Sequence, residues 1–166
     1  MRDQEFQRVA RELGHDFDGE LKIGGRYVPL LRDGATVYIS GQIPRVGDTV
    51  QVTGRACAGD GHGNGVSLTQ AQRAAAICVM RALALLQRSL GSLDRVRAVL
   101  RITVYVQCSD DFTQHSEVAD GASDVLYRIL GEAGRHTRTS VGVRQLPKNA
   151  TVELDMIATA DDVAAV

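Results

Sequence analysis

The chain has 166 residues, of which 44% are hydrophobic and 23% charged, as expected for one globular domain over residues 1–166. Its formal net charge of −1 argues against a general nucleic-acid-binding protein, since such proteins are strongly basic. No apolar run is long enough to span a bilayer, and the N-terminus lacks the apolar core of a signal peptide. We therefore expect a cytoplasmic protein without a membrane partner.

Cofactor and metal motifs are not evident. Cys57, Cys78 and Cys108 are far apart, and neither they nor the four histidines show the spacing of metal ligands. The glycine-rich segment 58–65 lacks the lysine and the spacing of a phosphate-binding loop, and no dinucleotide fingerprint is present. The sequence thus predicts a surface loop here, and neither a metal nor an organic cofactor.

The first third of the chain predicts one helix followed by strands. Phe6, Val9 and Leu13 have helical spacing, and Gly14 is a typical helix end. Two apolar runs, 27–31 and 36–40, are separated by a turn sequence and predict a β-hairpin. A further strand is expected at residues 50–56.

A long helix is predicted over residues 68–90. Ser67 and Gln70 form a capping-box pattern at its start. Most of its circumference is apolar, and its expected polar stripe consists of Gln70, Arg73, Arg81 and Arg88.

The remaining chain alternates strand, helix and two strands. In the strand 99–107, Leu100, Ile102, Val104 and Val106 are expected to face one way, and Arg101, Thr103 and Tyr105 the other. An apolar stripe then predicts a helix that ends at Gly131, and the last two strands flank Pro147. This order of elements indicates an α+β fold with helices on one face of a mixed sheet.

The strand around Arg138 raises a functional question, because its alternation places Arg138, Ser140, Gly142 and Arg144 on one face. We expect Arg138 and Ser140 on the sheet face away from the helices, together with Arg101, Tyr105 and Glu153. That face either stays in water or packs against other copies of the chain. In the second case Arg138 would grip a carboxylate in a subunit cleft, and Glu153 would orient a water molecule.

Three segments resemble one known family: "VYISGQIP" (37–44), "VLRITVYVQCSDDF" (99–112) and "TRTSVGVRQLPKNATVELDMIA" (137–158). They are similar to the YjgF/RidA family of imine deaminases, whose members also carry the name endoribonuclease L-PSP. The resemblance covers a core of residues 25–159 and leaves 1–14 as an N-terminal helical extension. It implies a chorismate-mutase-like fold and a homotrimer whose three sheets enclose a central barrel, with ligand clefts between subunits.

Site residues follow from the resemblance by position. Arg138 stands where the family binds the substrate carboxylate, and Glu153 where it holds the acidic residue linked to the attacking water. Tyr27 matches the cleft tyrosine, and Gly41 the glycine whose backbone faces the ligand.

Other positions mark a divergent member. Ser140 replaces a common cysteine, Pro29 replaces a polar residue near Tyr27, and Asp120 is aligned with the cleft asparagine as a substrate-binding position. An additional carboxylate at Asp120 would repel an anionic substrate unless it is paired.

From the resemblance and these residues we expect a hydrolase that converts 2-imino acids to 2-keto acids and ammonia without a cofactor. The alternative is a non-enzymatic trimer that binds a small carboxylate through the same cleft. A third hypothesis, ribonuclease activity, conflicts with the near-neutral charge and the low aromatic content of 4%.

Overall fold

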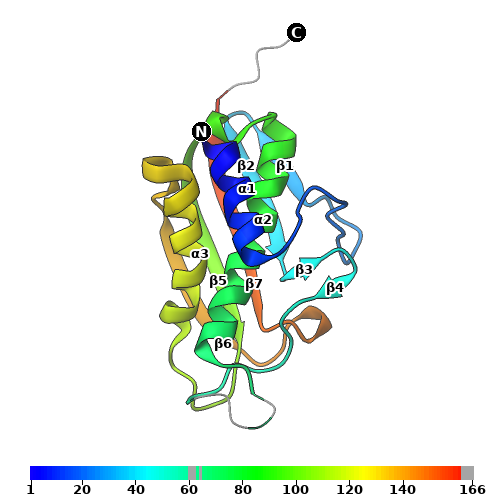
Figure 1. Ribbon diagram of the computed structural model, residues 1–166, viewed down its shortest axis with the longest axis vertical. Helices are drawn as coiled ribbons and strands as arrows, with labels where there is room; N and C mark the ends of the chain where they lie inside the picture. Colours follow the sequence, from blue (N-terminus) through cyan, green and yellow to red (C-terminus); the bar gives the residue numbers. More distant parts are fainter. Residues whose placement is uncertain (60–62, 64, 162–166) are drawn as a thin grey trace.

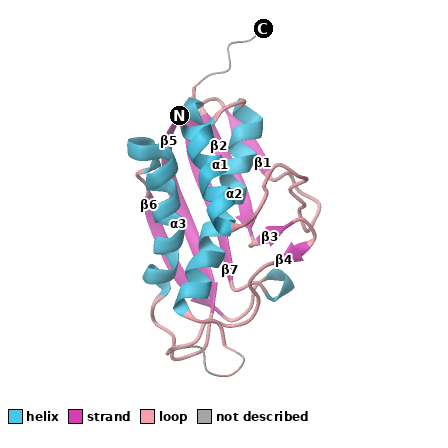
Figure 2. Ribbon diagram, in the orientation of Figure 1, coloured by secondary structure: helices cyan, strands magenta, loops and turns pink. Residues whose placement is uncertain are grey.

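The computed structural model describes residues 1–59, 63 and 65–161, and it consists of a helical layer on one face of a β-sheet (Figure 1). Half of the glycine-rich segment 58–65 that was predicted as a surface loop, residues 60–62 and 64, therefore lies outside the described residues. The three α-helices are α1 (Arg2–Leu13), α2 (Leu68–Leu90) and α3 (His115–Leu130). All three lie on the same side of the sheet (Figure 2). The expected α+β arrangement, including the additional N-terminal helix, is confirmed.

The main sheet has five strands in the spatial order β1-β2-β7-β5-β6. Their bounds are β1 Leu30–Asp33, β2 Thr36–Gln42, β7 Val152–Ala160, β5 Val96–Gln107 and β6 Thr137–Val143. Strand β6 runs parallel to β5, and the other neighbours are antiparallel, so the sheet is mixed as predicted. It is an open sheet with β1 and β6 at its edges, and the described chain alone forms no closed barrel.

The sequence beyond β2 forms less sheet than expected. Instead of a strand over 50–56, there is a two-stranded ribbon of β3 (Arg45–Val46) and β4 (Thr49–Val50). Farther along, only the isolated bridges of Thr53 and Ala56 are found. The predicted third strand is therefore wrong, because this segment pairs with loop backbone rather than with an edge of the main sheet.

Helix α2 has the predicted bounds and lies against the middle of the sheet. Its start is fixed by the capping box, in which the Ser67 hydroxyl accepts from the Gln70 backbone N–H at 3.2 Å and the Gln70 side chain accepts from the Ser67 backbone. Its alanines are buried at the contacts with the sheet and with α3. The expected polar stripe is wrong at Arg81, whose side chain is only 2% exposed.

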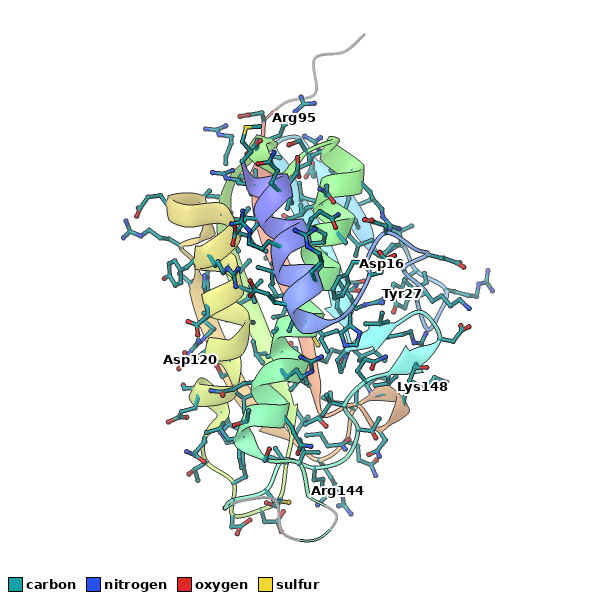
Figure 3. The ribbon with its side chains drawn as sticks, viewed as in Figure 1. Asp16, Tyr27, Arg95, Asp120, Arg144 and Lys148 are labelled. Atoms are coloured by element: carbon teal, nitrogen blue, oxygen red, sulfur yellow. The ribbon has the colours of Figure 1, made fainter. Side chains whose placement is uncertain are left out.

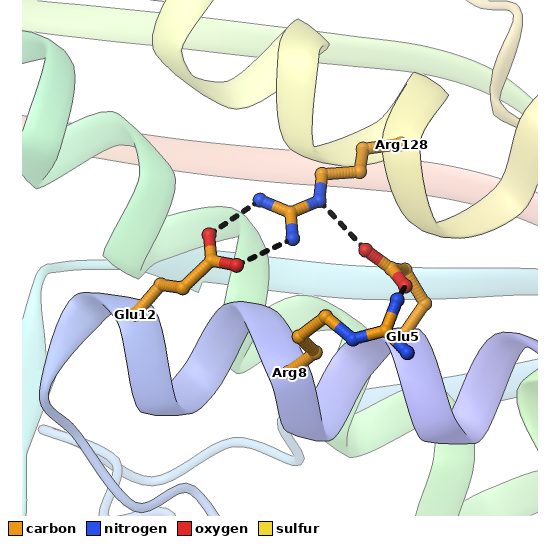
Figure 4. A network of polar contacts seen from close by, with 4 residues as sticks. All are labelled: Glu5, Arg8, Glu12 and Arg128. Carbon is orange, nitrogen blue, oxygen red and sulfur yellow. Dashed lines mark hydrogen bonds and ion pairs between the residues drawn. The ribbon is translucent and has the colours of Figure 1, made fainter.

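Helix α1 packs on both α2 and α3 and buries Phe6, Val9 and Ala10. It ends at Gly14, which adopts a left-handed φ of 72°, a conformation that glycine reaches without strain. An ion-pair network joins α1 to α3 (Figure 4). In it the Arg128 guanidinium donates to both Glu12 carboxylate oxygens, at 2.6 and 2.8 Å, and to Glu5 at 2.7 Å.

Strand β5 departs from simple alternation at two points, and the second of them changes the facing of Leu100. Leu100 is 44% exposed although it was predicted to face the helices, and Val99 is buried in its place at 1%. The pairing of β5 with β7 shifts between Val99 and Arg101, which marks a β-bulge. A bulge adds one residue to a strand and so reverses the facing of the residues before it. Beyond the bulge, Ile102, Val104 and Val106 are buried as predicted.

Candidate functional site

The expected site residues Tyr27, Gly41 and Glu153 lie together. They line one cavity of about 90 Å³, formed by the segment before β1, the end of β2 and the start of β7. Lys148, from the 3₁₀ turn Pro147–Asn149, lies at the same cavity and has a left-handed φ of 58°. Figure 3 shows Tyr27 and Lys148 on the same side of the molecule.

Gly41 is required by the position of the Glu153 carboxyl group. The pairing of β2 with β7 shifts between Ile39 and Gln42, so the backbone of Gly41 bulges next to Glu153. A Cβ atom at position 41 would lie 2.1 Å from Glu153 Oε1, far inside van der Waals contact. The carboxyl group thus occupies the space that any other residue at position 41 would fill.

The environment of Glu153 favours its protonated form. Burial of the carboxyl group raises its pKa above the ordinary glutamate value, and the negative charge of Asp155 raises it further. A carboxyl group with a raised pKa in a cavity is suited to accept and release a proton.

Arg81 forms a wall of the same cavity and was missed as a site residue. Its guanidinium donates to Gln42 Oε1 at 3.1 Å and to the backbone carbonyls of Arg45 at 2.7 Å and Lys22 at 2.9 Å. These bonds fix the loops around the cavity to α2. The signal in the sequence was the position of Arg81 within the run "ICVMRALALL", where a charged residue is flanked on both sides by apolar ones.

Arg138 and Asp120, the other expected binding residues, form a second cluster on α3 and β6. Arg138 Nη1 donates to Asp120 Oδ1 at 2.8 Å and to Ser123 Oγ at 2.9 Å, and Nη2 donates to the carbonyl of Ser116 at 3.2 Å. The additional carboxylate of Asp120 is therefore paired. Ser140 lies two residues farther along β6 and alternates to the same face as Arg138.

The strand register separates the two clusters. Residues that are paired across neighbouring strands project from the same face of a sheet. Arg138 is paired with Ile102, which is buried under the helices. Glu153 is paired with Tyr105, three positions from Ile102 along β5 and hence on the opposite face.

The prediction that Arg138 and Ser140 share a face with Glu153 is therefore wrong. Both faces of edge strand β6 carry polar residues, so alternation alone could not decide which face turns to the helices. Figure 3 places Asp120, the partner of Arg138, across the molecule from Tyr27 and Lys148.

A comparison with protein families identifies the chain. The family model described as "YjgF/chorismate_mutase-like, putative endoribonuclease" matches residues 14–159. The chain belongs to the YjgF/RidA family. The resemblance seen in the sequence is thereby confirmed, and with it the α+β fold of this family.

Individual relatives agree with this assignment. Protein TCP17 of Trypanosoma cruzi is 39% identical over 132 residues, which cover 79% of each chain. The crystal structure of Atu1372, a protein of unknown function from Agrobacterium tumefaciens, is 34% identical and has a TM-score of 0.81. That match covers 96% of this chain and 95% of Atu1372.

A more distant member of the same fold is TdcF from E. coli, solved with bound serine. It is 22% identical, with a TM-score of 0.59 over 84% of this chain and 91% of TdcF. At this level of identity the match concerns the fold alone.

Neither cluster of this YjgF/RidA protein resembles a metal centre. Within residues 1–59, 63 and 65–161, no group of three or more His, Cys, Asp or Glu side chains could hold a metal ion. Among the same residues, no helix is long and apolar enough to cross a membrane. The groups available for chemistry at the two clusters are carboxyl groups, guanidinium groups, the phenol of Tyr27 and the amino group of Lys148.

Proposed function

We propose that the protein hydrolyses 2-imino acids to 2-keto acids and ammonia, in clefts between copies of the chain. The observation that carries this proposal is the Glu153 carboxyl group, held in a cavity against the backbone of Gly41 with a pKa raised by burial. Such a group can accept a proton from water as the water oxygen forms a bond to the imine carbon. In that step the electron pair of the carbon–nitrogen double bond of the protonated imine moves to nitrogen. The same proton can then be given to the amine, so that the carbon–nitrogen bond breaks and ammonia leaves, while the hydroxyl proton passes to the carboxylate and the carbonyl forms.

Arg138 is the proposed carboxylate clamp, because a guanidinium can donate two parallel hydrogen bonds to a carboxylate. Since Arg138 and Glu153 project from opposite faces of the sheet, one small substrate cannot reach both within a single chain. The proposal therefore requires that a neighbouring copy bring its Arg138 to the Glu153 cavity. In this arrangement, Tyr27 at the cavity orients the substrate or passes a proton.

A second candidate function is the binding of a small carboxylate without turnover. It uses the same Arg138 clamp, and in both functions a ligand carboxylate must compete with Asp120 for the guanidinium. TdcF, which shares the fold, was solved with bound serine, so a small amino acid is a ligand to test for either function. Some relatives carry the name putative endoribonuclease, but no observation on the described residues of this chain supports ribonuclease activity.

Imine decay provides the test. An amino-acid oxidase would generate 2-iminobutanoate, and its loss would be followed with wild type, Arg138→Ala and Glu153→Gln. We expect wild type to accelerate the decay and both variants to lose most of that acceleration, by about 100-fold or more for the loss of a general base. An exposed substitution far from both clusters, Gln4→Ala, serves as the control and should retain full activity.

The two candidate functions give different results in the same experiment. Wild-type decay equal to the uncatalysed rate, together with calorimetric binding of 2-ketobutyrate that Arg138→Ala abolishes, would replace the enzyme with the binding protein. Equal activity of wild type and Arg138→Ala would contradict the proposed clamp.

A further inference from the structure

A second cavity, of about 560 Å³, opens at the end of the sheet where β5 and β6 finish and α3 begins. The residues that matter in its lining are Arg55, Cys108, Phe112, His115, Gly142 and Arg144. Cys108 directly follows β5, and His115 is the first residue of α3. None of these residues lines the Glu153 cavity, so the two cavities are separate. Arg144 marks this end of the molecule in Figure 3.

Cys108 and His115 face one another in this cavity. The Cys108 Sγ atom lies 3.5 Å from His115 Nε2, within the range of a hydrogen bond to sulfur. The buried ring of Phe112 meets the imidazole edge-on, with ring centroids 5.6 Å apart, and so fixes its orientation. A thiol beside an imidazole is the arrangement in which histidine removes the proton as sulfur attacks an electrophile.

Gly142 keeps the space around this pair open. A Cβ atom at position 142 would lie 2.5 Å from His115 Nε2 and 3.0 Å from Cys108 Sγ, so a side chain there would displace both groups. The glycine thus forms the floor of the cavity directly beneath the two reactive atoms.

The cavity also carries net positive charge. Arg55 and Arg144 line it, the acidic lining residue is Asp110, and Arg55 Nη2 donates to the backbone carbonyl of Arg144 at 3.4 Å. Burial raises the pKa of the Cys108 thiol, while the charge of Arg55 acts in the opposite direction. The resting group is therefore a neutral thiol, which needs a base to become a nucleophile.

We propose that Cys108 and His115 form a nucleophilic thiol site for small carboxylates with an electrophilic carbon, such as α,β-unsaturated acids. Arg55 and Arg144 would bind the carboxylate. The sulfur forms a bond to the β-carbon while the thiol proton moves to Nε2 of His115. The electron pair of the carbon–carbon double bond moves to the α-carbon, which takes the proton back from His115, and the product is a thioether. This site does not depend on the proposed imine hydrolysis.

Alkylation by a matched pair of reagents tests the site. Iodoacetate and iodoacetamide have nearly the same size and differ in charge, and with either one the sulfur displaces iodide. The rate at each cysteine of the full-length protein would be measured by peptide mass spectrometry and divided by the rate of glutathione. Cys57 is the internal reference, since it is similarly half-buried but does not line the cavity.

We expect Cys108 to react faster than Cys57, and to prefer iodoacetate over iodoacetamide more strongly than glutathione does. His115→Gln should slow the reaction at Cys108 by about 100-fold, the low end of general-base assistance, and leave Cys57 unchanged. Arg144→Gln should abolish the preference for iodoacetate but retain the reaction with iodoacetamide. If His115→Gln fails to fold, as judged by circular dichroism, the effect of Arg144→Gln on the preference for iodoacetate still tests the site.

Several results would overturn the proposal. Equal rates at Cys57 and Cys108 would remove the special reactivity of Cys108, and an unaltered rate in folded His115→Gln would remove the base. Prolonged incubation with maleate, an α,β-unsaturated acid, should add one molecule at Cys108 and none in Cys108→Ser. Absence of that adduct would exclude this class of ligand.

Discussion

At the scale of single residues, Glu153 has an environment that strand alternation alone does not predict. A glutamate on a strand of an open sheet would ordinarily be solvated, and its charge would cost little. Here the β2 bulge turns the backbone of Gly41 toward it, and burial together with Asp155 raises the pKa of the carboxyl group. The folded state therefore holds the Glu153 proton more tightly than the unfolded state does.

This raised pKa predicts a pH-dependent gain in stability for Glu153→Gln. Below about pH 4 the carboxyl group is protonated in both states, and the substitution should have little effect. As pH rises through the folded-state pKa, the charged form destabilises the native protein, so the variant should have the higher melting temperature at pH 7. Each kcal/mol of relief should appear as about 2–4 °C for a chain of this size.

Thermal unfolding of wild type and variant from pH 3.5 to 8 measures the effect. The exposed Glu20→Gln is a matched control that should show no such gain. A melting temperature of Glu153→Gln that equals that of wild type at pH 7, or a difference independent of pH, would contradict the assigned burial.

At the scale of elements, the helices could be predicted closely and the sheet only in part. Helical periodicity spans many residues and is anchored by local caps, which is why Ser67 and Gln70 marked the start of α2 correctly. Strand facing depends on long-range register, so one bulge near Leu100 was enough to reverse the expected side.

For the candidate site, the grouping of Tyr27, Gly41 and Glu153 agreed with their alignment to the family. The placement of Arg138 required the parallel pairing of β6, which its two polar faces did not reveal.

The contact between α2 and α3 depends on a glycine that helical periodicity does not mark as important. A Cβ atom at Gly121 of α3 would lie 2.2 Å from the Gln72 carbonyl oxygen of α2, which is backbone and cannot move aside alone. In addition, the Gln72 side chain donates to the Glu117 carbonyl at 2.8 Å, which holds the two helices at this distance.

Gly121→Ala should therefore destabilise the protein, although alanine is the better helix former by about 1 kcal/mol. Overpacking of this kind costs about 1–3 kcal/mol, and separation of the helices would add to the cost. Asp124→Ala, at an exposed position of α3, is the control and should change stability little. Urea unfolding of both variants gives the comparison, and a Gly121→Ala variant as stable as wild type would contradict the close approach.

At the scale of the whole molecule, the chain leaves one sheet face without a helical cover. All three helices lie on the other face (Figure 2). On the open face of the sheet, Tyr38 of β2 remains 45% exposed and Val141 of β6 remains 39% exposed. Glu153 lies on the open face, so association through that face would cover the Glu153 cavity with another copy. Arg138 belongs to the edge strand β6, and the edge of the neighbouring sheet is where it would reach that cavity. Assembly and the proposed catalysis are thus connected through the same strands.

We predict that the protein is a trimer in solution and that a charge on the open face weakens it. Tyr38→Lys or Val141→Lys would place an ammonium group where an apolar contact is expected, and burial of an unpaired charge is unfavourable. Light scattering coupled to size-exclusion chromatography should give a trimer mass for wild type, near three times 17.9 kDa. Each open-face variant should shift toward the monomer.

Tyr127→Lys is the control for these variants. It removes an exposed aromatic side chain from α3, on the opposite face, and should leave the mass unchanged. In the variants that dissociate, loss of imine hydrolysis should accompany loss of the trimer, because monomers cannot bring Arg138 of one copy to Glu153 of another. A wild-type monomer that retained full activity would contradict both the assembly and the shared site.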